Sequence, residues 1–149
     1  MKPQRILPPT FLLVALVIML AIHFIFPGVT IIPLPWNFLG LIPLTGGILL
    51  NLNADRLFHL AGTTVKPFQE STALITQGVF RISRHPMYLG FVLILVGVAI
   101  LLGSLTPWVI VPVFIVRMEI IYIRVEEHML EERFGLAWME YKKKVRRWL

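Results

Sequence analysis

Four long apolar segments constrain this chain more than any other feature of its sequence. They cover about residues 11–26, 36–52, 87–105 and 108–123. About 20 consecutive apolar residues allow a helix to cross the hydrocarbon core of a bilayer. The chain is 57% hydrophobic and 15% charged, whereas soluble domains carry about 25% charged residues. The sequence therefore predicts an all-α integral membrane protein of one domain, residues 1–149, with about four transmembrane helices.

The positions of the basic residues predict how these helices are oriented. The net charge is +6, and nearly all Lys and Arg residues lie at the N-terminus (Lys2 and Arg5), in the stretch 53–84 and in the tail 124–149. The two remaining links between apolar segments contain none. Because Lys and Arg accumulate on the cytoplasmic side of a membrane, both termini are predicted to be cytoplasmic. Basic residues that flank apolar segments indicate lipid headgroups as their partners and argue against nucleic acid.

The charged tail is predicted to end in an amphipathic helix on the membrane surface. The fourth segment is expected to continue as a helix to a break at Gly135. Beyond it, Trp138, Tyr141, Val145 and Trp148 recur at helical spacing among Lys and Arg residues. Such a face is typical of an interfacial helix that lies on anionic lipid.

One polar cluster lies where the long polar stretch meets the third apolar segment. It reads Arg84-His85-Pro86-Met87-Tyr88. Pro86 suits the first turn of a helix, and a helix N-terminus presents free N–H groups and a partial positive charge. With Arg84 and His85 beside it, this helix start suits an anionic or carboxylate-bearing ligand. The alternative is a basic flank with an aromatic residue at the membrane interface.

A second polar cluster, Glu126-Glu127, follows the fourth apolar segment. Its carboxylates could bind a cation or an amine, and antiparallel helices would bring it to the first cluster. The alternative is a solvated helix face in which Arg124 pairs with Glu127. Arg117 lies about 9 Å inside the fourth span at 1.5 Å per residue. Ionisable residues at such a depth usually face a cavity or a partner, unless they snorkel to the surface.

Several of these motifs together resemble a known family. They are Leu74-Ile-Thr-Gln-Gly-Val-Phe-Arg-Ile-Ser-Arg-His-Pro-Met-Tyr-Leu-Gly90, Glu126-Glu127, Phe134-Gly135 and Tyr141. In this order and spacing they resemble the isoprenylcysteine carboxyl methyltransferase family, to which phospholipid N-methyltransferases are related. The resemblance implies an integral membrane enzyme with its active site on the cytoplasmic face. It also implies S-adenosylmethionine as cofactor, bound by about residues 72–90 and 124–135.

The resemblance also implies individual site residues. By motif position, the cofactor-binding residues are Leu74, Ile75, Phe80, His85, Pro86, Met87, Tyr88, Glu126 and Glu127. Phe80 departs from the Tyr that is common in the family. The carboxyl-methylating enzymes place a substrate-binding Arg shortly before the Glu pair, where this chain has Tyr122. Arg117 and Arg124 lie on either side of Tyr122 and are therefore the candidate catalytic residues. No metal site is predicted, because no His pair has an evident third ligand.

The expected reaction is transfer of a methyl group to a lipidic or hydrophobic small substrate that enters from the bilayer. The carboxylate of an isoprenylcysteine is one candidate acceptor, and the headgroup of a phospholipid, methylated on nitrogen, is another. Two other readings stay open. A non-enzymatic membrane scaffold or lipid-binding module would have no affinity for the cofactor. A membrane reductase of the sterol reductase type would need a nicotinamide site.

Overall fold

The computed structural model describes residues 6–64, 66, 69 and 71–149. Within these residues the regular elements are helical, and an isolated antiparallel bridge joins Thr30 to Ser104. The predicted all-α fold is therefore confirmed for the described part of the chain. Lys2 and Arg5, which carried part of the orientation argument, lie outside it.

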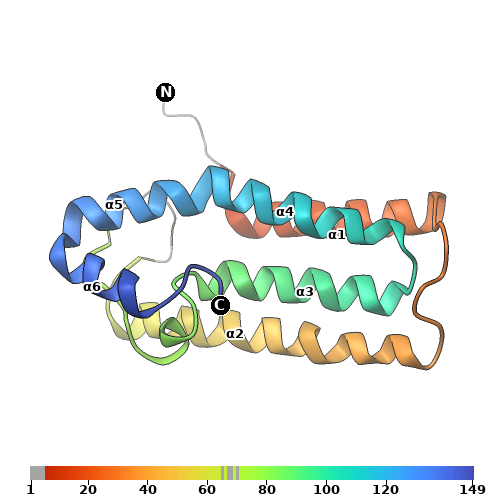
Figure 1. Cartoon of the computed structure of the whole chain (residues 1–149), viewed down its shortest axis with the longest axis horizontal. Coiled ribbons are helices and arrows are strands. Elements are labelled where there is room, and N and C mark those ends of the chain that lie inside the picture. The colour runs from red at the N-terminus through yellow and green to blue at the C-terminus, as the bar shows by residue number, and fades with distance from the viewer. Residues whose placement is uncertain (1–5, 65, 67–68, 70) are drawn as a thin grey trace.

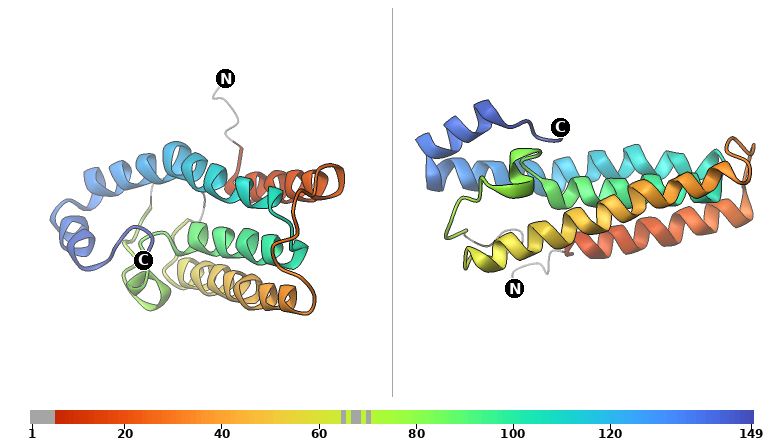
Figure 2. Two further views of the ribbon diagram at one scale, coloured as in Figure 1. Left: turned by 45° about the vertical axis from the view of Figure 1, so that its right-hand side comes forward. Right: turned by 90° about the horizontal axis from the view of Figure 1, so that it is seen from below.

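Four helical rods lie side by side and alternate in direction (Figure 1). The fourth rod is continuous from α4 through η4 into α5, and α6 folds back beside its end (Figure 2). The elements, in chain order, are α1 (Pro8–Ile25), η1 (Trp36–Gly40), α2 (Leu41–Leu60), η2 (Gly78–Arg81), α3 (Pro86–Leu102), η3 (Thr106–Val109), α4 (Ile110–Met118), η4 (Glu119–Ile123), α5 (Arg124–Phe134) and α6 (Leu136–Lys144). Of these, η1, η2 and η3 are 3₁₀ turns, and η4 is a π-helical turn.

Proline and glycine set several of the helix ends. α1 and α3 begin at Pro8 and Pro86, where the missing N–H group of proline costs no helical hydrogen bond. α3 ends before Gly103, which has φ +71°, and α5 ends before Gly135, which has φ +48°. Positive φ is easy for glycine and ends a helix. The break at Gly135 and the starts of the first and third helices agree with the sequence prediction to within a few residues.

The second predicted segment, 36–52, differs from the structure at both ends. Its first five residues form η1, and α2 continues to Leu60. The polar residues that follow the apolar part remain helical because they lie on the exposed side. Asp55 and His59, for example, form an i,i+4 pair at 3.4 Å. The apolar pattern therefore predicted where the apolar surface of the helix ends, while the helix itself extends about two turns further.

Glycine residues bring α2 and α3 into backbone contact. A Cβ atom on Gly47 would lie 2.4 Å from the carbonyl oxygen of Gly90, and one on Gly40 would lie 2.4 Å from that of Gly97. Gly40 and Gly47 are seven residues apart, and so are Gly90 and Gly97. Seven residues are close to two helical turns, so both contacts lie on one face of each rod. Gly46 faces open space. The glycines at positions 40 and 47 therefore allow the second rod to approach α3 of the same chain closely.

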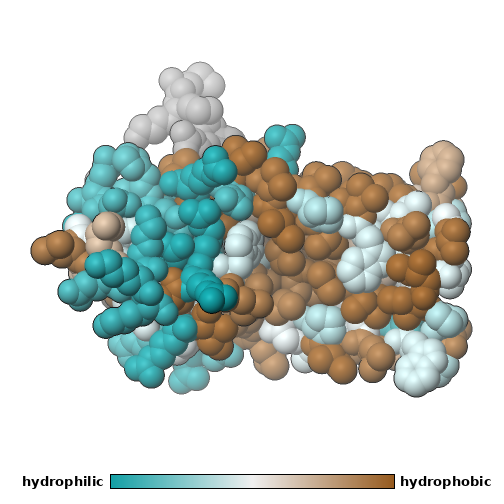
Figure 3. Space-filling model, viewed as in Figure 1, coloured by the Kyte–Doolittle hydropathy of each residue, from teal (hydrophilic) through white to brown (hydrophobic). Residues whose placement is uncertain are grey.

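The bundle divides sharply into an apolar part and a polar part. On the face seen in Figure 3, apolar residues predominate over the part of the bundle that contains α4 and α3, whereas polar residues gather around α5 and α6. α1 and the segment Trp36–Leu60 are long and apolar enough to cross a membrane, and α3 is a shorter apolar helix. Side chains such as Val14, Phe24 and Leu49 are exposed. Apolar surface of this extent fits contact with lipid.

The structure of the tail differs from the predicted interfacial helix. Trp138 and Tyr141 on α6 are 1% and 6% exposed and pack against Phe80 and Ala54. The Tyr141 hydroxyl also donates a 2.6 Å hydrogen bond to the carbonyl of Phe80. Val145 follows the helix in an extended conformation. The aromatic face of the tail therefore packs against η2 and α2 of the protein and does not lie on lipid.

The glycine contact generates a stability prediction. Gly47→Ala places a methyl group against the backbone of α3, so we expect the free energy of unfolding to fall by about 1–3 kcal/mol. Gly46→Ala is the matched control, and it is expected to be neutral or stabilising by up to about 1 kcal/mol because Ala favours the helix. Thermal unfolding of both variants in detergent tests this. Equal melting temperatures would contradict the proposed packing.

Candidate functional site

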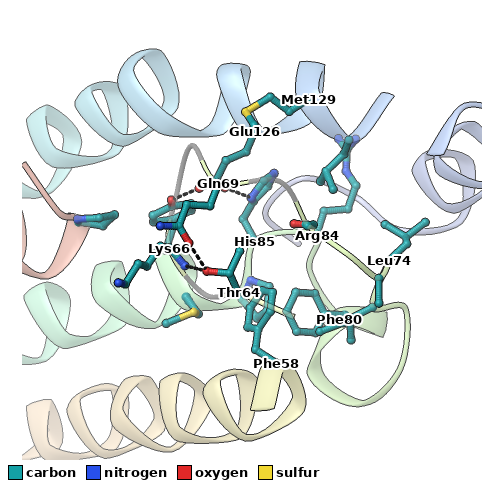
Figure 4. A pocket seen from close by; sticks show the side chains of 18 of the residues that line it. Phe58, Thr64, Lys66, Gln69, Leu74, Phe80, Arg84, His85, Glu126 and Met129 are labelled. Atoms are coloured by element: carbon teal, nitrogen blue, oxygen red, sulfur yellow. Dashed lines mark hydrogen bonds and ion pairs between the residues drawn. The ribbon is translucent and has the colours of Figure 1, made fainter. Parts of the chain in front are cut away.

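A cavity of about 470 Å³ lies where the polar end meets the apolar bundle. Its walls come from the start of α1, the end of α2, the segment after α2, η2, the start of α3, α5 and α6. Figure 4 shows Glu126 reaching in from α5 and Phe58 from the end of α2, with His85 between them. A cavity of this volume is typical of sites for small molecules and cofactors.

The cavity collects the residues of both predicted motifs. Eight of the nine predicted cofactor-binding residues line it, namely Leu74, Ile75, Phe80, His85, Pro86, Met87, Tyr88 and Glu126. The ninth, Glu127, is buried behind His85. The two motifs are separated by about forty residues in the chain, and the antiparallel arrangement of α3 and the fourth rod brings them together. The alternative of a solvated face for Glu126-Glu127 is therefore not supported.

Glu126 presents its carboxylate at the cavity wall and is held by two neighbours. The Tyr88 hydroxyl, one turn inside α3, donates a 2.6 Å hydrogen bond to Oε1 of Glu126. The other carboxylate oxygen, Oε2, lies 3.6 Å from Nδ1 of His85. This geometry fixes the direction of the carboxylate toward the cavity. It leaves the site with a negative group that can pair with an ammonium or accept from hydroxyls.

Glu127 is the centre of a buried charge cluster. Its Oε1 lies 3.2 Å from Nε2 of His85 and 3.3 Å from Nη1 of Arg84. Arg147 binds it through two nitrogens, with Nε 3.1 Å from Oε1 and Nη2 2.7 Å from Oε2. Glu127 itself is only 6% exposed. Three positive or donor groups thus compensate one buried carboxylate, as a buried charge requires.

These contacts set the protonation states of the cluster. Burial alone would raise the pKa of Glu127, but hydrogen bonds from His85 and Arg147 and the nearby charges lower this pKa to about 2. Burial works to lower the pKa of His85, and the two carboxylates outweigh it and raise that pKa above its ordinary value. His85 lies between Glu126 and Glu127 with one ring nitrogen toward each. An imidazolium that donates from both nitrogens fits this position.

The opposite wall is aromatic and apolar. The rings of Phe58 and Phe80 meet edge to face at 5.4 Å between centroids, and Trp138 lies nearby on α6. Phe80 thus presents a ring without the hydroxyl of the Tyr expected there. The apolar side chains of Leu7 and Phe91 also border the cavity. The site therefore offers charged groups on one side and a surface for a flat ring on the other.

The two predicted catalytic arginines are not brought to the cavity. Arg117 is exposed on the surface of α4. The side chain of Arg124 is 65% exposed and lies 3.7 Å from Glu119, not beside Glu127. Tyr122, between them, is buried and donates a hydrogen bond to the carbonyl of Ile6. Their positions follow from the helix, because residues on the outer face of the fourth rod point away from α3.

Sequence reasoning missed several residues of the site. Met129 and Leu130 line the cavity and were not named individually. Arg84, which was expected beside the helix start to favour an anion, lines the cavity as well. Met129 and Leu130 are three and four residues after Glu126, a spacing that places them on the same helix face and could have identified them. Arg147 was assigned to the lipid surface, and no local pattern indicates that the chain folds back after α6.

The helices and this cavity define a helical protein with a small-molecule site at the border of its lipid-like surface. The phospholipid methyltransferase family model matches residues 36–137, which is more than half of the chain. The chain therefore belongs to the phospholipid methyltransferase family. The matched range contains both motifs of the site.

Individual relatives point in the same direction. Protein-S-isoprenylcysteine O-methyltransferase A of Arabidopsis thaliana is 35% identical over 78 residues, covering 52% of this chain and 40% of that protein. Protein-S-isoprenylcysteine O-methyltransferase of Saccharomyces cerevisiae is 39% identical over 92 residues, covering 58% of this chain and 38% of that protein. The chain thus spans about two fifths of the length of these curated relatives.

A solved structure shares the fold. It is that of a eukaryotic intramembrane Ras methyltransferase, isoprenylcysteine carboxyl methyltransferase, with a TM-score of 0.69 and 24% sequence identity. The match covers 99% of this chain and 52% of the other. Nearly the whole chain therefore adopts an arrangement of helices known from an intramembrane methyltransferase.

The buried carboxylate generates a pH prediction. Because the pKa of Glu127 is lowered in the folded state to about 2, its stabilising effect is complete above its unfolded pKa. This effect is lost as the pH falls toward 2. We expect Glu127→Gln to lower the free energy of unfolding at pH 7 by about 3 kcal/mol.

Unfolding in detergent from pH 7 down to acid measures both effects. In Glu127→Gln the free energy of unfolding should fall less on acidification than it does in the parent protein. Glu131→Gln, which removes an exposed carboxylate 3.7 Å from Lys142, should change stability by less than about 1 kcal/mol. The assignment of Glu127 would be refuted by an equal effect of the two substitutions at pH 7.

Proposed function

We propose that this protein is an integral membrane methyltransferase that uses S-adenosylmethionine. The observation that carries the proposal is the gathering of Glu126, His85 and Tyr88 with the aromatic wall around one cavity. Family membership and the named activities of the curated relatives support it. The scaffold and reductase readings have no comparable support from the residues that line the cavity.

The chemistry of the lining residues fits the parts of this cofactor. Glu126 suits the amine or the ribose hydroxyls. Arg84 and the start of α3 suit the carboxylate, since a helix N-terminus with a positive side chain favours an anion. The rings of Phe58 and Phe80 suit the adenine. When bound, the cofactor would supply a methyl group on a positively charged sulfur.

Catalysis of such a transfer depends mainly on alignment. The acceptor, the methyl carbon and the sulfur must lie in line, and holding reactants in that geometry accounts for much of the rate. We propose that the network of Tyr88, His85 and the two glutamates fixes the cofactor side. The apolar border at Leu7 and Phe91 would admit the acceptor from the bilayer and limit water. Gly90 and Gly97 on α3 contact α2 and the end of η1, so we place the entrance at this apolar border and not along that face of α3.

A carboxylate acceptor, as in an isoprenylcysteine, fits the site better than an amine. A carboxylate is ionised at neutral pH and needs only a cation to position it, and Lys66 lines the cavity. Lys66 replaces Arg117 and Arg124 in our assignment. An ethanolamine headgroup would first have to lose a proton to a general base. His85 is poorly suited to that role, because its pKa is raised by the two carboxylates.

We further propose that the cavity faces the cytoplasm and that four rods span the membrane with both termini on that side. The polar end carries the basic tail residues, including Lys142, Lys143 and Lys144, and the apolar end has no Lys or Arg in its described links. This asymmetry is the one that orients membrane proteins.

Cofactor binding provides the direct test. Calorimetry with S-adenosylhomocysteine and the purified protein in detergent should give micromolar affinity, and Glu126→Gln should lower it at least tenfold. Glu140→Gln, which removes an exposed carboxylate of α6, should bind as the parent protein does. No binding by the folded parent protein would reject the methyltransferase proposal and leave a membrane scaffold.

The acceptor class is tested with labelled S-adenosylmethionine. We expect transfer of label to a farnesylated or geranylgeranylated cysteine with a free carboxyl group, giving a base-labile ester. Phosphatidylethanolamine vesicles serve as the second acceptor. Label in the phospholipid alone would favour the N-methyltransferase alternative, which the family description supports.

A further inference from the structure

The last residues of the chain return to the start of α3. The backbone N–H of Arg84 donates a 3.0 Å hydrogen bond to the carbonyl of Arg146. The hydroxyl of Ser83 donates a 2.9 Å hydrogen bond to the carbonyl of Arg147. The tail is therefore attached by its backbone to the two residues that precede His85.

The side chain of Arg147 joins this attachment to the fourth rod. Its Nε and Nη2 bind the two oxygens of Glu127 at 3.1 Å and 2.7 Å. Its Nη1 donates a 2.9 Å hydrogen bond to Glu119 in the π-helical turn η4. A guanidinium that binds a carboxylate through two nitrogens fixes the orientation as well as the charge of that carboxylate. Arg147 is absent from the cavity wall, so it does not touch a ligand there.

Glu127 transmits this orientation to the site. The oxygen that receives Nε of Arg147 is Oε1, which also lies 3.2 Å from Nε2 of His85. His85 in turn lies beside Glu126, which faces the cavity. We propose that Arg147 is a positioning residue for cofactor binding, acting through Glu127 on His85 and Glu126. This inference rests on the proposed function, because it concerns the same cofactor site.

Removing the guanidinium has a defined electrostatic consequence. The charged or titratable groups that face Glu127 are His85 and Arg84, from the segment before α3, and Arg147, from the tail. Without Arg147, the pKa of Glu127 rises toward its ordinary value, because one of the groups that lower it is lost. Acid should then weaken ligand binding at a higher pH than in the parent protein.

Arg147→Gln, Arg147→Lys and Arg146→Gln form the experimental set. S-adenosylhomocysteine binding is measured by calorimetry at pH 7 and then at decreasing pH. We expect Arg147→Gln to weaken binding about 10- to 100-fold. We also expect the pH at which acid weakens binding to be about one unit higher than in the parent protein. Arg147→Lys keeps the charge and loses the two-nitrogen contact, so its affinity should lie between that of the parent protein and that of Arg147→Gln. Arg146→Gln removes the same charge from the adjacent exposed residue and should bind within about twofold of the parent protein.

The outcomes separate this inference from the proposed function. If the parent protein does not bind S-adenosylhomocysteine, the proposed function fails. If it binds but Arg147→Gln matches Arg146→Gln in affinity and pH profile, the positioning role is overturned while the function stands. Should Arg147→Gln fail to fold, Arg147→Lys decides: a weakened affinity at an unchanged melting temperature supports the role, and parent-like affinity and pH profile overturn it.

Discussion

The structure of the polar end depends on one buried carboxylate. Glu127 lies almost out of contact with solvent, and an ionised group there is very unfavourable unless it is paired. Its partners come from the segment before α3 and from the tail. The compensation is complete only when both segments are in place on α5. Satisfying this charge therefore couples three parts of the chain that are distant in sequence, and the cavity lies beside their junction.

The bundle and the cavity are organised by opposite physical demands. On the apolar side of the cavity, α2 and α3 approach closely through glycine. The outer surface there is apolar, which suits the contact with lipid that we propose. On the polar side, aromatic residues of α6 cover η2 and form part of the cavity wall. A water-soluble cofactor and a lipid acceptor would reach the site from different sides. Its position at the border between the two surfaces is what lets one cavity serve both.

Sequence patterns identified the features that depend on local chemistry. The apolar segments, Pro86 and Gly135 were sufficient for most helix positions. The two motifs were sufficient for Arg84, His85, Tyr88 and Glu126 in the cavity, but not for other polar lining residues such as Lys66. What they missed depends on long-range packing. Nothing local shows that Trp138 faces η2 instead of lipid, or that Arg147 returns to Glu127. Arg117 and Arg124 were misplaced because nearness in sequence to the Glu pair does not place a side chain on the same helix face.

The π-helical turn η4 makes the winding of the fourth rod matter as much as its composition. A π-helical turn holds one residue more than an α-helical turn, because its hydrogen bonds join residues five apart and not four. One residue corresponds to a rotation of about 100° along an α-helix. If Glu119–Ile123 kept all five residues and wound as a regular α-helix, α5 would rotate by about this angle relative to α4, and Glu126 and Glu127 would turn away from His85. Every functional group would still be present, and the site would be gone. The winding of η4 therefore sets the orientation of α5 relative to α4.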